Sequence, residues 1–378
     1  MPVTANDDKR KSARLYYLDW LRIWATFILI PYHTARIFDY VPWYIKNESY
    51  GAFYEAMNRF TEIWHMPLFF LISGAATRCF FDAGKGNAFL RERVKRLFVP
   101  FLFGVVVLVP PVTYIRFITL NPESGYDYLE YYPHFFKIVP KAIDGLAGTF
   151  TPLHLWFILF LFLFSLVAFP LFRYMATERG GQVLSKWAGV ISRKGALILL
   201  VASLPALIRL IGLPYPDPLY FFLFFVLGFV LMSDGSFMEA ISTHQKTALV
   251  LAIVASFVVM YERMTEAVPG AFPIYQGLGI EVMIGVAAWF WMIAFLGYGK
   301  RYLNFSSALS KYLNKAAYPV YLTHMTFIVP LGFYFGEWDT RMGLQYSFIN
   351  LITLAGTIAV YEVIVRQNSV TRFLFGLR

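Results

Sequence analysis

Ten apolar stretches, most of them close to membrane length, recur along the chain and constrain its fold more than any other feature. Two of them are weaker than the others, because only a proline-rich turn separates 195–213 from 217–233. A helix needs about 20 mainly apolar residues to cross a bilayer. The pattern therefore predicts an all-α fold, a polytopic integral membrane bundle of about ten transmembrane helices. The ten stretches are 16–38, 57–80, 97–119, 153–174, 195–213, 217–233, 246–262, 272–297, 314–335 and 343–365.

The composition argues against an ordinary soluble domain. Of the 378 residues, 58% are hydrophobic and 15% are charged, whereas soluble domains are about half apolar and about a quarter charged. The net charge of +10 lies mostly in the connections between apolar stretches, so we expect no nucleic-acid partner. The single cysteine, Cys79, excludes an internal disulfide, and the scattered histidines predict no metal site.

Lysine and arginine gather in alternate connections. They are frequent in the N-terminal tail, in the connections after the second, fourth and eighth stretches, and at the C-terminal end. The opposite connections contain few of them and several acidic residues. The positive-inside rule then places both termini of this multi-pass protein in the cytoplasm. The first apolar run lacks a small-residue cleavage site, so we interpret it as a retained helix rather than a signal peptide.

We expect residues 1–378 to form a single transmembrane domain. Residues 1–15 are predicted to be a cytoplasmic tail, and residues 119–152 a long outer loop. The loop contains a tyrosine-rich run and His134, which is typical of a helix at the membrane interface or of a lid over an outer cleft.

The first apolar stretch contains two ionisable residues, Arg22 and His33. Their spacing is close to three helical turns, which places them on one helix face about 16 Å apart along the axis. Ionisable side chains inside membrane helices usually line a cavity, so the pair is a candidate functional site. An imidazole titrates near neutral pH, which suits His33 to proton transfer. The alternatives are a hydrogen bond between packed helices for His33, and snorkelling or an ion pair with Asp19 for Arg22.

A basic cluster precedes the third apolar stretch. It consists of Arg91, Arg93, Lys95 and Arg96, and the second and last of these share a helix face. Guanidinium groups suit phosphate oxygens, so the cluster is a candidate clamp for a large anionic ligand such as coenzyme A. The alternative is an ordinary positive-inside flank.

Further polar residues lie inside other stretches. His65, in the second stretch, is either a supporting residue of the site or a structural histidine, and we count it among the catalytic candidates. Gly74 in the same stretch predicts close helix packing. His154 begins the fourth stretch and is interpreted as part of an aromatic belt. Four more buried groups need partners, and Arg209 and Glu281 could pair with each other or with Arg22; the four are Arg209, Glu281, Glu362 and His324.

Several motifs together resemble those of the membrane-bound acyltransferase type 3 superfamily, whose members add acyl groups to sugars and other acceptors. Two segments, RLYYLDWLR and HMPLFFLISG, are most similar to the glucan-biosynthesis protein C (glucan succinyltransferase) branch. The motifs that carry the resemblance are LDWLR at Leu18–Arg22, the Arg22-x10-His33 spacing, HMPLFFLISG at His65–Gly74, Arg93-x-x-Arg96 and YPVYLTH at Tyr318–His324.

The resemblance implies a ten-helix core and an integral-membrane O-acyltransferase. Its donor would be cytoplasmic acyl-CoA, as succinyl-CoA or acetyl-CoA, with no permanently bound cofactor, and its acceptor a hydroxyl of a glycan on the outer side. His33 would be the catalytic histidine, Arg22 would position the donor, and Arg93 and Arg96 would contact CoA. Membrane lipid is the remaining expected partner, and a homodimer is left open.

Two rival functions remain at this stage. A transporter or flippase for an anionic glycan or lipid would also place charges inside the membrane, although inverted repeats and broken helices, typical of transporters, are not evident. A membrane scaffold would use the buried charges only as ion pairs. Phosphate-binding glycine loops, zinc-protease motifs and serine-nucleophile elbows are missing from the sequence.

Overall fold

The computed structural model describes residues 14–140, 143–193, 197–265, 277–336, 338 and 340–377. Most of the predicted tail at 1–15 therefore lies outside the described residues. Throughout the described ranges, the regular secondary structure is helical, as predicted. The α-helices are α1 (Tyr16–Ala35), α2 (Ala52–Asp82), α3 (Phe89–Arg93), α4 (Val99–Phe103), α5 (Pro110–Leu120), α6 (Tyr128–Phe135), α7 (Trp156–Met175), α8 (Glu178–Arg193), α9 (Leu197–Leu200), α10 (Ser203–Arg209), α11 (Pro218–Leu231), α12 (Gly235–Thr265), α13 (Leu278–Tyr302), α14 (Ala308–Phe335), α15 (Met342–Ala359) and α16 (Ser369–Leu374).

Shorter 3-10 and π-helical turns connect some of these helices. They are the 3-10 turns η2 (Gly86–Ala88), η5 (Pro122–Ser124) and η7 (Leu153–Leu155), and the π-helices η3 (Val94–Phe98), η4 (Gly104–Leu108) and η8 (Val360–Val365).

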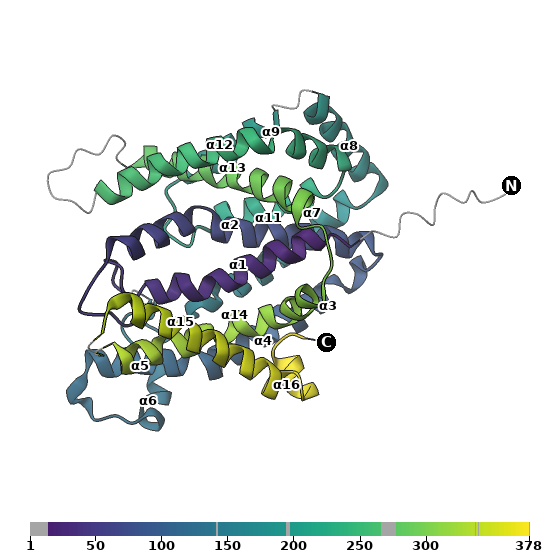
Figure 1. Ribbon diagram of the computed structural model, residues 1–378. Coiled ribbons are helices and arrows are strands. Elements are labelled where there is room, and N and C mark those ends of the chain that lie inside the picture. Colours follow the sequence, from purple (N-terminus) through teal and green to yellow (C-terminus); the bar gives the residue numbers. More distant parts are fainter. Residues whose placement is uncertain are drawn as a thin grey trace. The chain divides into compact units, whose positions relative to one another are not determined.

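The chain divides into two compact units. The first unit comprises Met1–Arg22, Arg59–Arg91 and Leu163–Ser310. The second unit comprises Ile23–Asn58, Glu92–Phe162 and Lys311–Arg378. In the first unit, α12 and α13 run side by side, and α10 also packs on α13 (Figure 1). In the second unit, α16 packs on α4, and α6 packs on α5.

Five helical segments among the described residues are long and apolar enough to cross a membrane. A sixth is possible if Glu178–Arg193 and Ile198–Arg209, which are bent by 111°, form one span. The predicted number of ten is therefore not confirmed. Helices occur at the other predicted ranges, but α1, α2 and α14 include charged, histidine and proline residues that lower their hydropathy. The five segments are Gly86–Leu120, Leu153–Met175, Gly235–Met264, Leu278–Tyr302 and Met342–Val365.

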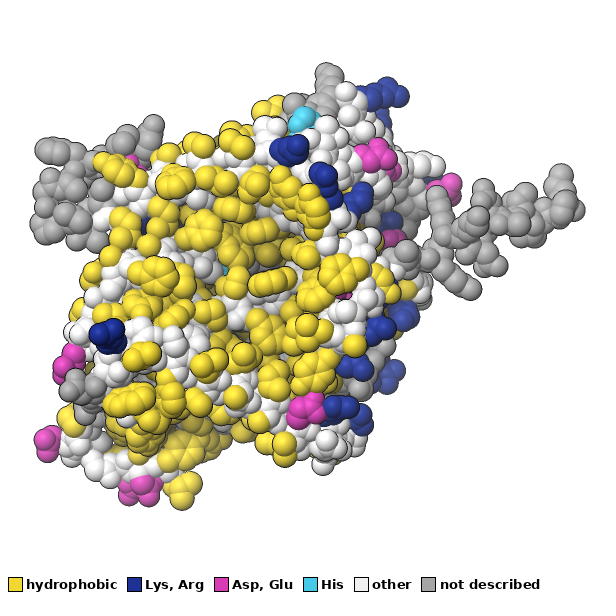
Figure 2. Space-filling model, viewed as in Figure 1, with side chains coloured by type: hydrophobic (Ala, Val, Ile, Leu, Met, Phe, Trp, Pro, Cys, Tyr) yellow, Lys and Arg dark blue, Asp and Glu magenta, His cyan; other side chains and the backbone are white. Residues whose placement is uncertain are grey.

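The outward faces of these helices suit contact with lipid. Figure 2 shows hydrophobic side chains covering the visible faces of α12 in the first unit and α15 in the second. Val250 and Phe257 of α12 are exposed, and so are Leu344 and Leu351 of α15. Exposed apolar area of this extent is costly in water but favourable in hydrocarbon, which fits helices that face a bilayer.

Prolines interrupt the helical hydrogen bonds of the second unit, and tyrosines compensate for them. Pro100 has no N–H to offer to the carbonyl of Arg96 four residues earlier, and Tyr318 of α14 donates its hydroxyl to that oxygen at 2.8 Å. Pro110 likewise leaves the carbonyl of Val106 without a helical donor. This oxygen accepts the hydroxyl of Tyr132 at 3.0 Å. A lost backbone bond is costly in hydrocarbon, so these tyrosines hold neighbouring elements together.

The predicted outer loop contains a helix, α6, whose start is fixed by a capping box. The Asp127 side chain accepts the N–H of Glu130 at 2.9 Å, and the Glu130 side chain accepts the N–H of Asp127 at 3.0 Å. Tyr131 is buried beneath the loop and donates its hydroxyl to the carbonyl of Gly148 at 3.0 Å. Burial raises the pKa of this phenol, so it stays protonated at neutral pH.

Two contacts of the first unit follow from residues singled out in the sequence. Arg209 forms an ion pair with Glu281, and Arg263 lies 3.8 Å from the same carboxylate. Gly74 of α2 meets α11 so closely that an added Cβ would lie 1.9 Å from the carbonyl oxygen of Phe225. The contact is reciprocal, because a Cβ on Gly228 would lie 1.9 Å from the carbonyl oxygen of Leu71. Only glycine allows this backbone approach, as predicted for Gly74.

We predict that Gly228→Ala destabilises the protein. The added methyl would overlap the backbone of α2, and overpacking of this kind costs about 1–3 kcal/mol. The thermal unfolding midpoint of the detergent-solubilised protein should fall by several degrees. Gly189→Ala in α8 is the control, because a Cβ there meets nothing within 4 Å. An unchanged midpoint for Gly228→Ala would contradict the close approach of α2 and α11.

Candidate active site

Three of the six histidines meet in the second unit. His33 lies near the C-terminal end of α1, His154 lies in η7, and His324 lies in the interior of α14. The ring of His324 is 5.1 Å from that of His33 and 4.8 Å from that of His154, measured between centroids. Both His154 and His324 are buried. We call these residues the histidine cluster.

Main-chain carbonyls of α14 fix the protonation of two of these rings. Nδ1 of His324 lies 2.6 Å from the carbonyl oxygen of Tyr321, and Nε2 of His154 lies 3.1 Å from that of Leu322. A carbonyl oxygen only accepts hydrogen bonds, so the facing nitrogen of each ring carries a proton. In the neutral form this leaves Nε2 of His324 and Nδ1 of His154 as proton acceptors.

Aromatic side chains border His33. Tyr32 meets its ring edge-on at 4.8 Å, and Trp43 stacks on it at 6.1 Å with an interplanar angle of 12°. Trp43 belongs to the connection between α1 and α2, which turns back toward the end of α1. The neighbouring residue Tyr44 donates its hydroxyl to the carbonyl of Asp144 in the predicted outer loop. The aromatic rings therefore restrict access to His33 from this side.

A buried carboxylate, Asp39, holds this connection in place. Its oxygens accept from Arg36 at 3.0 Å, Lys46 at 2.8 Å and Asn58 at 2.8 Å. Burial lowers the pKa of the Lys46 ammonium, and the hydrogen bond from Lys46 to Asp39 raises it in opposition. A fully buried carboxylate is stable only when it is paired and hydrogen-bonded. Here Arg36 and Lys46 supply the opposite charges, and Asn58 donates a further hydrogen bond.

One face of α14 connects the histidine cluster to the segment that carries Arg93 and Arg96, which we call the arginine segment. Tyr318, Tyr321 and His324 are spaced by three residues, so they follow one another along the helix over about 9 Å. The two tyrosine rings stack at 6.1 Å with an interplanar angle of 2°. At one end, Tyr321 donates its hydroxyl to the carbonyl of His154 at 2.7 Å. At the other end, Tyr318 is hydrogen-bonded to the backbone of Arg96, as described above.

The predicted phosphate clamp lies where α3 passes into the π-helix η3. Arg93 ends α3, and Lys95 and Arg96 lie within η3. Lys95 and Arg96 are exposed, and Arg93 is partly buried. Arg96 pairs with Glu92 at 3.1 Å, and Arg91 is an exposed residue of the first unit. π-helical turns are rare and often occur at functional sites, because they alter the direction of side chains.

Arg22 and His65, the other two catalytic candidates, belong to the first unit. Arg22 is bound to Asp19 at 3.1 Å, which is the ion pair considered from the sequence. His65 is buried and packs edge-on against Phe69 at 5.0 Å. A single helix, α1, carries both Arg22 and His33, as predicted. Arg22 and His65 belong to a different unit from His33, and their roles beside it stay predictions.

The histidine cluster is not predicted by the sequence pattern. That pattern indicates an aromatic belt for His154 and names no partner for His324. The only available signal was that His324 interrupts an apolar stretch, as His33 does. The cluster is not arranged for a metal: within the described ranges, no group of three or more His, Cys, Asp or Glu residues could hold one. Acid–base chemistry and hydrogen bonding are what its imidazoles offer.

The chain is similar to known proteins over almost its whole length. The chain is 24% identical to glucans biosynthesis protein C of Escherichia coli (strain SMS-3-5 / SECEC), over 97% of this chain and 95% of the relative. It is also 24% identical to glucans biosynthesis protein C of Salmonella typhimurium, with the same coverage. No solved structure matches the chain. The family model of the acyltransferase domain matches residues 15–362, which include the histidine cluster and the arginine segment. The chain therefore belongs to this membrane-bound acyltransferase family, and it is an acyltransferase.

Proposed function

We propose that the protein is an O-acyltransferase that moves a succinyl or acetyl group from cytoplasmic acyl-CoA to a hydroxyl of a glycan or similar acceptor on the outer side. The observation that carries the proposal is the row of side chains on α14 between the arginine segment and the histidine cluster. It supports the proposal because Arg93, Arg96 and the histidine cluster belong to the same unit. The similarity to glucans biosynthesis protein C supports a glycan acceptor.

The donor would bind through its phosphates at the basic cluster. The charged side chains there are Arg91, Arg93, Lys95 and Arg96, and guanidinium forks match phosphate oxygens well. Arg22 would bind and orient the thioester end of the donor, as the family resemblance implies. We also propose that the protein is a bundle of about ten transmembrane helices in a bacterial cell, with both termini in the cytoplasm. The donor would enter from the same side, because acyl-CoA is made in the cytoplasm.

The chemical step would use His33 as a general base. A ring nitrogen of His33 takes the proton of the acceptor hydroxyl as the oxygen attacks the thioester carbonyl carbon. The carbon–sulfur bond then breaks, and the departing thiolate takes the proton back from the imidazolium. The products are an ester and the free thiol of CoA, and His33 returns to its neutral form.

His324 would position His33 during this step. Its Nδ1–H is held by the Tyr321 carbonyl, so Nε2 is the acceptor nitrogen of this ring, whose centroid lies 5.1 Å from that of His33. An acceptor there favours the imidazolium that forms when the substrate proton is taken up, and it fixes the orientation of the ring. His154 would support His324 from the other side through their ring contact.

We predict that His33→Ala lowers transfer from labelled succinyl- or acetyl-CoA at least about 100-fold, because a positioned general base contributes about 10²–10⁴-fold. The measurement is labelled product formed by the purified protein in proteoliposomes that contain glycan acceptor. His244→Ala in α12, outside the cluster, is the matched control. Wild-type turnover in His33→Ala would rule out His33 as the base, and no donor consumption by the wild type would favour a transporter.

We predict that His324→Gln lowers kcat about tenfold, corresponding to the loss of one hydrogen bond near 1.4 kcal/mol. The KM for acyl-CoA should stay unchanged, because the donor phosphates bind at the other end of the row. A purely structural role would instead lower the amount of folded protein and change both constants. Equal kcat in the variant and the wild type would show that His324 does not position His33.

We predict that the double variant Arg93→Ala/Arg96→Ala raises the KM for acyl-CoA by at least about tenfold, because hydrogen bonds to charged groups contribute about 1.5–3 kcal/mol. Titration of the purified protein with a non-hydrolysable acyl-CoA analogue gives the binding constant directly. Arg179→Ala, which removes a cation from α8 in the first unit, controls for net charge. An unchanged affinity in the double variant would remove the phosphate clamp from the proposal.

A further inference from the structure

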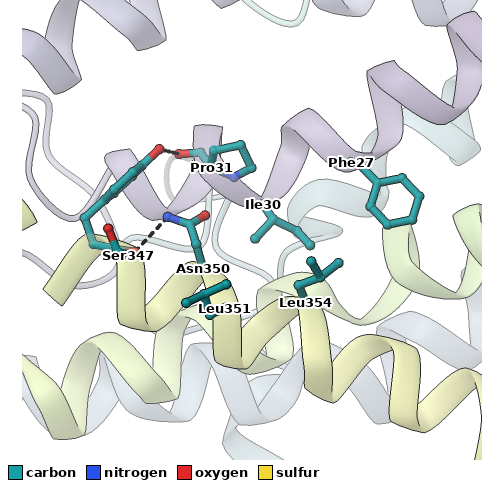
Figure 3. A pocket seen from close by; sticks show the side chains of 8 residues that line it. Phe27, Ile30, Pro31, Ser347, Asn350, Leu351 and Leu354 are labelled. Carbon is teal, nitrogen blue, oxygen red and sulfur yellow. Dashed lines mark hydrogen bonds between the residues drawn. The ribbon is translucent and has the colours of Figure 1, made fainter. Parts of the chain in front are cut away.

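A groove of about 510 Å³ runs between α1 and α15 in the second unit (Figure 3). Phe27, Ile30 and Leu354 line its apolar part, and Tyr346 and Asn350 lie at its polar part. Its size falls in the range of small-ligand sites, about 300–1,000 Å³. Leu351, on the same wall, is 66% exposed, so the groove opens sideways from the molecule.

The polar residues of the groove form hydrogen bonds to α1 and within α15, and one acceptor oxygen has no donor in the described part of the chain. Tyr346 donates its hydroxyl to the carbonyl of Pro31 at 3.3 Å, which ties α15 to α1. Nδ2 of Asn350 donates to the carbonyl of Tyr346 at 2.7 Å. Oδ1 of Asn350 is buried and accepts no hydrogen bond from the described residues. In Figure 3, the Asn350 side chain points from α15 toward Pro31 and Ile30 of α1.

An unsatisfied buried acceptor costs about 1–3 kcal/mol, and more than that where water is scarce. This one belongs to α15, within Met342–Val365, one of the segments apolar enough to span a membrane. A ligand that satisfies it must therefore come from the bilayer. It must also combine an apolar chain, for the long part of the groove, with a hydrogen-bond donor for Asn350.

We propose that the groove is a binding site for a bilayer phospholipid whose headgroup can donate a hydrogen bond. One acyl chain lies along Phe27, Ile30 and Leu354, and an ammonium or hydroxyl of the headgroup donates to Oδ1 of Asn350. The lipid bridges α15 and α1, the helix that ends beside His33. The site does not depend on the acyl transfer proposed above.

Photo-crosslinking with phospholipids that carry a diazirine in one acyl chain tests the site. The purified protein is reconstituted with phosphatidylethanolamine or phosphatidylcholine probes, which differ in whether the headgroup has an N–H donor. We expect phosphatidylethanolamine to label peptides from 23–35 and 342–359 at least several-fold more than phosphatidylcholine does. Equal labelling by both probes, or labelling spread evenly over the lipid-facing helices, would overturn the proposal.

Variants separate the two parts of the groove. Asn350→Leu removes the acceptor and should abolish the preference for phosphatidylethanolamine. Leu354→Trp fills the apolar part and should abolish labelling by both probes at these peptides. Val363→Trp, at a residue 71% exposed beyond the groove, should leave labelling unchanged. Size-exclusion chromatography verifies that each variant is folded, and a preference retained in folded Asn350→Leu would contradict the role of its oxygen.

Discussion

Within hydrocarbon, a backbone carbonyl without a hydrogen-bond donor is costly, and this constraint determines how the helices of the second unit meet. Proline residues inside the third apolar segment create such carbonyls at Arg96 and Val106. Tyrosine hydroxyls from other elements, Tyr318 and Tyr132, take the place of the missing donors. Each bond fixes one element against another with directional precision that apolar packing between lipid-facing helices does not provide.

The histidine cluster depends on this arrangement. Tyr318 anchors α14 to η3, and the next residues on the same face are Tyr321 and His324. Tyr321 uses its hydroxyl for the carbonyl of His154 and its own carbonyl for the ring of His324. One residue therefore sets the position of one histidine and the tautomer of another. A displacement of α14 by a single residue would rotate this face by about 100° and separate the ring of His324 from that of His33.

Local patterns account for the part of the fold that was predicted correctly. Hydrophobic length located the helices, and the spacing of Arg22 and His33 placed both on α1. A small residue in an apolar stretch predicted the close approach at Gly74. The number of membrane spans could not be settled in this way, because α1 and α14 include the candidate site residues together with other charged residues and prolines, and are less apolar for that reason. Hydropathy is therefore least informative for the helices that carry the candidate site.

The parts of the candidate site that the sequence did not predict depend on contacts between residues far apart in the chain. His154 and His324 lie more than a hundred residues from His33, and their rings meet only because helices from three parts of the chain pack together. Each histidine taken alone is compatible with an interfacial or packing role, so spacing along the chain carries no signal of their meeting. Trp43 was missed for the same reason, since the connection after α1 reaches His33 only when Asp39 gathers Arg36, Lys46 and Asn58 around it.

The Asp39 network also explains how a charged connection can lie beside an apolar site. Arg36 and Lys46 would be costly beside buried rings as isolated cations, and Asp39 would be costlier still as an isolated anion. The buried carboxylate of Glu55, which raises the pKa of the Lys46 ammonium, balances the remaining positive charge, and the amide of Asn58 completes the hydrogen bonding of Asp39. The stacking of Trp43 on His33 therefore rests on an electrostatic arrangement several residues away. The aromatic wall of the site and the ion pairs at the end of α1 are one structural element.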